Sequence, residues 1–158
     1  MMKRSLSFVT LMTLLAGGAC GGSGGDALLS STLMGQFQGQ SFTPTSGVAT
    51  VYQGSNLIAV GDGPLTCSST QQNDPPMGTT ATFSVPALAV GTYSSVFVDL
   101  VRYEARNFDG FGSSDATVTL SAVDAMSVTG TIAYSYTDTS TGDSYALSGD
   151  FQVSRCPM

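Results

Sequence analysis

The sequence contains no histidine and no tryptophan, and its only glutamate is Glu104. Without histidine the chain has no Ser-His-Asp triad and no usual zinc or copper site. Its one lysine, Lys3, stands at the extreme N-terminus. Because Glu104 is the only glutamate, a two-carboxylate hydrolase would depend on aspartates, and no aspartate pair stands out. We expect a protein that is not an enzyme and holds no cofactor, with an Asp-based hydrolase as a remote alternative.

Basic residues are also scarce, five against eleven acidic ones. Cleavage before Cys20 would remove Lys3 and Arg4, leaving three arginines and a formal charge of −8. Binding to nucleic acid needs clustered Lys and Arg, so we exclude a nucleic-acid partner. The same charge disfavours adhesion of the body to an anionic lipid surface. Ser, Thr and Gly replace the missing charges, which is typical of an exported β-rich domain.

The N-terminus has the three parts of a secretory signal peptide. Basic Lys3 and Arg4 precede an uncharged apolar run over residues 6–16, and small residues follow it. The run is too short to cross a membrane, which takes about 20 apolar residues. A buried core helix is the alternative, but the basic start and glycine-rich exit argue against it. We predict that residues 1–19 are a signal peptide.

Small residues followed by Cys20 resemble the lipobox of bacterial lipoproteins. In that family the cysteine thiol carries diacylglycerol, and the new amino end is acylated, commonly with palmitate. The sequence departs from the pattern at Gly17, where the family prefers Leu, Val or Ile. Gly17 and Ala19 also suit ordinary secretory cleavage, which would release a soluble secreted or periplasmic protein. Both forms of processing stay open, and the resemblance favours attachment to the membrane through lipid on Cys20.

The cysteine count and the segment behind Cys20 also favour the anchor. Three cysteines in an exported protein leave one without an internal partner. Lipidation of Cys20 would leave Cys67 and Cys156 to form a disulfide, as an oxidising compartment allows. The stretch "GGSGGD" is typical of a flexible tether. We predict a tether over residues 20–32 and one β-domain over residues 33–158.

Alternation of apolar and polar residues predicts an all-β body. Residues 117–123, 129–137 and 144–154 alternate as half-buried strands do. Residues 96–103 are apolar on both faces apart from Asp99 and Arg102, which predicts a central strand. Short strands at this spacing indicate an antiparallel β-sandwich or a barrel-like meander. The other strand candidates are residues 35–42, 47–53, 56–63, 65–69, 79–85 and 91–103.

The last two strands have complementary patterns that predict one register. With residues 139–142 as the hairpin loop, every apolar position faces an apolar residue or a glycine on the same side. Each glycine then lies opposite a large side chain, which compensates for it in a sheet. The predicted pairs are Tyr136 with Tyr145, Tyr134 with Leu147, Ile132 with Gly149, and Gly130 with Phe151. The preceding strand would pair Leu120 with Gly130.

Three loops are candidate sites. Residues 107–115 offer Asn107, Asp109 and Asp115 as weak calcium ligands, with Ser113 beside them; Asp138, Ser140 and Asp143 form a second oxygen-rich loop. Calcium takes six to eight oxygens, and neither loop matches the EF-hand pattern, so solvated turns are the simpler interpretation. The loop over residues 68–78 could contact a protein partner through Pro75, Pro76 and Met77.

Taken together, the N-terminus, the tether, the β-rich body and the terminal "SGDFQVSRC" resemble small lipoproteins of Gram-negative bacteria. In these a meander ends in a G-x-F strand just before a final cysteine. The resemblance implies a lipid-anchored domain with a structural or interaction role. Gly21 follows the cysteine where Asp would signal retention in the inner membrane, which implies the outer membrane. No activity comes with the resemblance, so a small binding protein or inhibitor using residues 68–78 remains the alternative.

Overall fold

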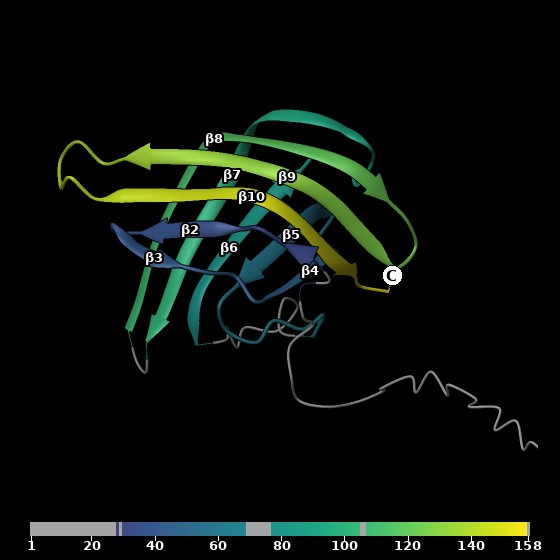
Figure 1. Cartoon of the computed structure of the whole chain (residues 1–158), viewed down its shortest axis with the longest axis horizontal. Coiled ribbons are helices and arrows are strands. Elements are labelled where there is room, and N and C mark those ends of the chain that lie inside the picture. The colour runs from purple at the N-terminus through teal and green to yellow at the C-terminus, as the bar shows by residue number, and fades with distance from the viewer. Residues whose placement is uncertain (1–27, 29, 69–76, 105–106, 158) are drawn as a thin grey trace, which may run out of the picture.

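The computed structural model describes residue 28 and residues 30–68, 77–104 and 107–157 (Figure 1). The described residues form ten strands; they contain no helix, and so none long and apolar enough to cross a membrane. The all-β prediction is confirmed. The predicted signal peptide, Cys20 and most of the tether lie outside the described residues. The strands are β1 (Ser30–Ser31), β2 (Met34–Phe37), β3 (Gln40–Phe42), β4 (Ser46–Tyr52), β5 (Ser55–Gly61), β6 (Gly78–Val85), β7 (Gly91–Glu104), β8 (Asn107–Val123), β9 (Ser127–Thr137) and β10 (Ser144–Arg155).

Strands β4 to β10 form a closed seven-stranded barrel. Each strand pairs antiparallel with the next one in the chain, and β10 closes the ring by pairing parallel with β4. This closing seam is short. Ser154 pairs with Val48 and Arg155 with Ala49, and the Cys156 amide donates to the Ala49 carbonyl over 2.8 Å. Of the two architectures predicted, the chain therefore adopts the barrel.

Strand β10 serves two sets of neighbours. One edge pairs with β9 from Ser144 to Ser154, and the other edge pairs in turn with β2, β1 and β4. β2 and β3 form a hairpin beside the barrel (Figure 1). Its turn residues, Gln38 and Gly39, have φ angles of 51° and 75°, as a two-residue type I′ turn requires. The single strand predicted over residues 35–42 is thus two strands.

The folded domain begins before residue 33. Ser30 and Ser31, which the sequence assigned to the tether, form β1 and pair with Gln152 and Phe151 of β10. Leu28 packs against the apolar core, and its amide donates to the Thr45 carbonyl over 3.2 Å. The part of the predicted tether that the structure describes therefore lies on the barrel wall.

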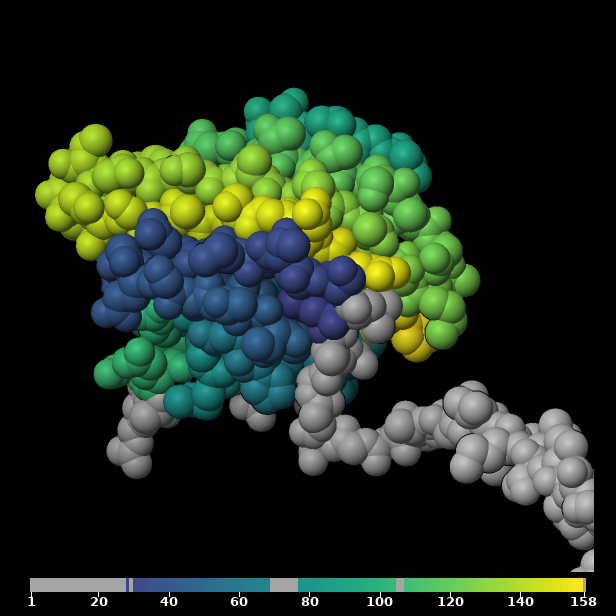
Figure 2. Space-filling model, viewed as in Figure 1, coloured from purple at the N-terminus to yellow at the C-terminus, as the bar shows by residue number. Residues whose placement is uncertain are grey.

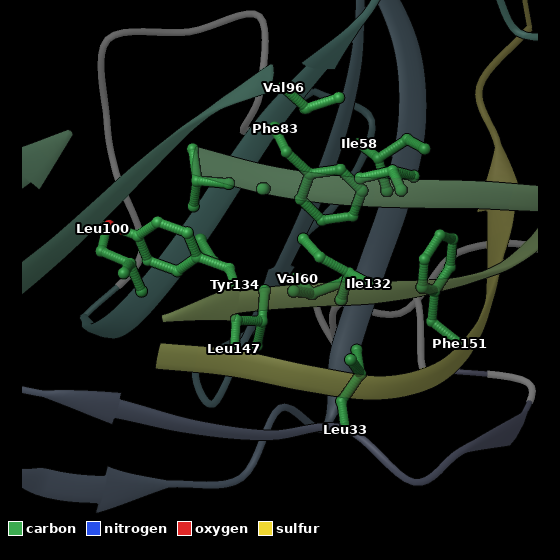
Figure 3. Close-up of a cluster of buried hydrophobic side chains, with 14 of the residues drawn as sticks. Leu33, Ile58, Val60, Phe83, Val96, Leu100, Ile132, Tyr134, Leu147 and Phe151 are labelled. Atoms are coloured by element: carbon green, nitrogen blue, oxygen red, sulfur yellow. The ribbon is translucent and has the colours of Figure 1, made fainter. Parts of the chain in front are cut away.

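Apolar side chains from the barrel strands fill its interior. Figure 3 shows Phe83, Leu147 and their neighbours converging between the strands. The rings of Phe83 and Phe151 meet edge to face with centroids 5.6 Å apart, and both are buried. Burial of a side chain of this size stabilises the fold by roughly 1.5–3 kcal/mol. The inward positions of the strands are therefore a packed core, as in other small barrels.

The C-terminal register is confirmed at every predicted pair. Tyr136 lies opposite Tyr145, Tyr134 opposite Leu147, and Leu120 opposite Gly130. Phe151 also faces Gly130, where a Cβ would collide with the Thr119 carbonyl oxygen. Only glycine fits between these neighbours. The pairing of Gly130 with Phe151 therefore reflects the close approach of the Phe151 ring and the Thr119 carbonyl to the Gly130 backbone. The remaining predicted pair, Ile132 with Gly149, is present as well.

The prediction of a central strand over residues 96–103 is confirmed by its pairing, although only one face of the strand is covered; the strand predicted over residues 65–69 is wrong. Residues 96–103 belong to β7, which is paired on both edges, but only the inward side chains of Val96, Val98 and Leu100 are buried. Phe97 points outward and is 48% exposed, because a single-layer barrel leaves the outer face of this strand uncovered. Residues 65–69, predicted as a strand, contain none in their described part. They lie instead beside the outer face of β4 and β5, where Leu65 packs on Val48 and Ala59.

The predicted disulfide between Cys67 and Cys156 is present, with the two Cα atoms 5.5 Å apart. Cys156 directly follows the end of β10 and packs with Val48, Ala59 and Leu65 in a second, smaller apolar cluster. The bridge therefore fastens the segment after β5 to the point where β10 meets β4. It reinforces the parallel seam, which is the shortest pairing in the ring.

Candidate functional site

The candidate site is a hollow of about 280 Å³ at the end of the barrel where β7 ends and β8 begins. We call it the polar mouth. Figure 2 shows the β2–β3 hairpin and the start of β8 at this same end of the molecule. Both elements contribute side chains to the mouth. Its lining residues are Phe37, Gln38, Gln40, Arg102, Glu104, Asn107 and Asp109.

The strand period explains why four of these side chains face inward. Val98 and Leu100 of β7 point into the core, and Arg102 and Glu104 continue the same alternation beyond it. Across the strand pair, Asp109 lies opposite Arg102 and Asn107 opposite Glu104. Directly opposed residues share a face of an antiparallel pair. The inward face of β7 and β8 thus changes from apolar to charged where the core ends.

The β2–β3 hairpin forms the other side of the mouth. The Gln38 amide Nε2 donates to Asp109 Oδ2 over 2.6 Å, and Arg102 Nη1 donates to Gln40 Oε1 over 2.7 Å. The tight turn at Gln38 and Gly39 places both glutamines at the tip of the hairpin. Two hydrogen bonds to charged groups therefore join the hairpin to β7 and β8 across the hollow.

Neutral groups hold the Arg102 guanidinium in place. Nε donates to Thr79 Oγ1 over 3.0 Å, and the guanidinium carbon lies 4.8 Å from the centroid of the Phe37 ring. Thr79 is buried and lies opposite Arg102 in the register of β6 and β7. Of the five N–H donors of an arginine, two are used in the hydrogen bonds with Thr79 and Gln40. The guanidinium is thus oriented by neutral partners, and three of its donors are not used in these two hydrogen bonds.

Phe37, the one aromatic residue that lines the mouth, belongs to a larger aromatic cluster. Phe37 meets Tyr145 edge to face at 5.5 Å between centroids, and Phe111 stacks between Tyr145 and Tyr136 at 4.2 and 4.7 Å. Burial raises the pKa of the Tyr145 hydroxyl, and its hydrogen bond with Gln38 opposes that rise. Tyr145 therefore stays protonated at neutral pH. The cluster packs against Phe37, and the Phe37 ring in turn lies under the Arg102 guanidinium.

The structure places two of the three predicted calcium ligands, Asn107 and Asp109, at the mouth and the third, Asp115, away from it. Residues 107–115, predicted as a loop, are the first half of β8. Asn107 and Asp109 line the mouth, whereas the exposed Asp115 lies at an irregularity in the pairing with β7. Asn107 and Asp109 alone supply too few oxygens for calcium, which takes six to eight. Within the described residues no three His, Cys, Asp or Glu side chains are grouped to hold a metal ion.

The second candidate loop stabilises itself. Asp138 Oδ1 accepts hydrogen bonds from the Ser140 amide and hydroxyl, over 2.8 and 2.6 Å. These bonds lower the pKa of Asp138. Its carboxylate is thus already engaged in the turn between β9 and β10, and we assign it a structural role. In the predicted partner loop, residues 69–76, with Pro75 and Pro76, lie outside the described residues, and Met77 beside them is 56% exposed.

Sequence reasoning missed Gln38, Gln40, Arg102 and Glu104 as site residues. One available signal was the alternation of β7, in which apolar Val98 and Leu100 give way to Arg102 and Glu104 on the same face. No family model matches the chain, and no curated protein or solved structure matches it significantly. The geometry of the mouth is therefore the evidence from which a function can be inferred.

Proposed function

We propose that this protein is a lipid-anchored binding domain of the bacterial outer membrane, and that its polar mouth receives a small polar ligand. The observation that supports binding most strongly is the convergence of both charge signs and three amides in one hollow. Elsewhere the barrel interior is filled with apolar side chains. Ligands commonly bind in the mouths of β-barrels, where placed polar groups fix their orientation.

The cysteine arrangement supports the anchor. Cys67 and Cys156 form the disulfide, which leaves Cys20 as the third cysteine of the chain. A lipidated Cys20, preceded by a signal peptide and followed by a glycine-rich tether, accounts for this odd count. Release of a soluble secreted or periplasmic protein is the alternative processing.

Nuclear magnetic resonance of the full chain in detergent micelles tests the binding proposal. A panel of neutral sugars, amino acids, small carboxylates and nucleosides is titrated against the ¹⁵N-labelled protein. We expect at least one compound to shift the amides of residues 38–40, 102–104 and 107–109 saturably. Shifts confined to residues 68–78 would favour the loop as the binding surface, and no shift with any compound would overturn the proposal.

A further inference from the structure

The inward side chains of β7 and β8 place three charged groups and one amide of the mouth at the corners of a four-sided figure. Arg102 lies opposite Asp109, and Glu104 lies opposite Asn107. Directly opposed residues have Cβ atoms about 5 Å apart, and diagonal ones lie about 7–8 Å apart. The two carboxylates therefore occupy one diagonal, and the guanidinium and the Asn107 amide occupy the other. This pattern brings both charge signs within reach of one small molecule.

Neutral partners orient two of these charges. Gln38 donates to Asp109, and Thr79 and Gln40 accept from Arg102. A guanidinium fixed in this way is suited to a planar carboxylate, which it can bind through two parallel hydrogen bonds. A ligand that carried only a carboxylate would also face repulsion from Glu104 and Asp109, in a mature chain of net negative charge.

If the ligand also carries an ammonium group, Glu104 and Asp109 attract that group, and this attraction offsets the repulsion of the carboxylate. The hollow of about 280 Å³ is smaller than most drug-sized pockets, which begin near ~300 Å³. We infer that the mouth binds the zwitterionic head of a free α-amino acid. The ligand carboxylate lies against Arg102 and Asn107, and its ammonium lies between Glu104 and Asp109. The inference rests on the proposed binding function and names its ligand class.

Three matched probes test the ligand class on the full chain in detergent micelles. L-alanine carries both charges, propionate lacks the ammonium, and ethylamine lacks the carboxylate. We expect the Kd of alanine to be about tenfold lower than that of either analogue, because each lost charge removes a charged hydrogen bond. Arg102→Gln should weaken alanine and propionate together.

Two acidic substitutions separate binding from folding. Asp109→Asn and Glu104→Gln should each weaken the binding of alanine several-fold and strengthen the binding of propionate. Each substitution removes a carboxylate that attracts the ammonium of alanine and repels the carboxylate of propionate. Loss of structure cannot produce opposite changes for two ligands. Asp115→Asn is the matched control on β8, since Asp115 lies outside the mouth, and it should leave both Kd values unchanged.

The two proposals fail in different ways. If propionate or a neutral sugar binds at the mouth as tightly as alanine, the zwitterion inference is overturned while the binding function stands. The same holds if no common amino acid shifts the mouth amides but another compound does. If no compound of the wider panel shifts them, the binding function itself is overturned.

Discussion

Arg102 of β7 and Asp109 of β8 lie opposite one another at the polar mouth, and each is hydrogen-bonded to a different glutamine of the β2–β3 hairpin. The hairpin, which is distant in sequence from β7 and β8, thus fixes the positions of the two opposite charges. These hydrogen bonds orient both side chains at the hollow. This relationship is the structural basis for our proposal that the mouth is a binding site.

Two neighbouring substitutions test the facing of the C-terminal hairpin. Leu147 is fully buried, whereas Ala146 points out of the barrel and is half-buried. Leu147→Asp should cost about 3 kcal/mol or more of unfolding free energy, because it buries an unpaired carboxylate. Ala146→Asp should cost about 1 kcal/mol or less. Thermal melts of the two variants check this, and equal damage would show that both faces are covered.

The disulfide should stabilise the barrel seam. Replacing Cys67 and Cys156 together by alanine should lower the unfolding free energy by up to about 4.6 kcal/mol, since the bridged cysteines are 89 residues apart in sequence. Reduction of the wild type should speed hydrogen exchange at the Cys156 amide, which donates to Ala49 across the seam, more than at Leu147. An unchanged melting temperature and unchanged exchange would rule out this role.

Asp99 should make stability depend on pH. Partial burial on the outer face of β7 raises its pKa above the ordinary 3.8. The folded state therefore favours the neutral carboxyl, and stability is lost as the pH rises from about 3.8 through the raised pKa. Asp99→Asn should raise the melting temperature at pH 7, and the gain should disappear at pH 3. Exposed Asp115→Asn is the control, and an equal gain at both pH values would contradict the account.

Cys20 should determine where the protein is found. Cys20→Ser removes the thiol that lipidation requires, so the protein should move from the membrane fraction to the soluble fraction or remain as an uncleaved precursor. Fractionation of cells followed by mass analysis of the mature N-terminus checks this. Cys67→Ser, which leaves Cys20 intact, should still yield lipidated protein. Normal cleavage of Cys20→Ser with unchanged membrane association would exclude the anchor.

The sequence predicted those parts of the fold whose signals are local. The register of β9 and β10 followed from glycines set against aromatic residues on neighbouring strands, and it is correct from Gly130 to Phe151. The turn at Gln38 was missed because glutamine rarely adopts a positive φ, so the residues appeared to continue one strand. Residues 107–115 were mistaken for a loop because their Asn, Asp, Gly and Ser content is typical of turns.

The mouth could not be predicted from local sequence patterns. It forms because the β2–β3 hairpin contacts strands more than 60 residues away in the chain. Alternation can show that Arg102 and Glu104 share the inward face of β7, but it does not show what covers the end of the barrel. That depends on β10, whose second edge pairs with β2 and so directs the hairpin toward the mouth.

The most direct test of the central claim is to fill the polar mouth and measure binding. Asn107 is exposed at its rim, so Asn107→Trp should occupy the hollow without disturbing the core; Asp115→Trp places the same side chain elsewhere on β8. The best ligand of the panel is titrated against both variants and the wild type. We predict wild-type Kd for Asp115→Trp and no measurable binding for Asn107→Trp. Wild-type binding by a folded Asn107→Trp protein would contradict the account.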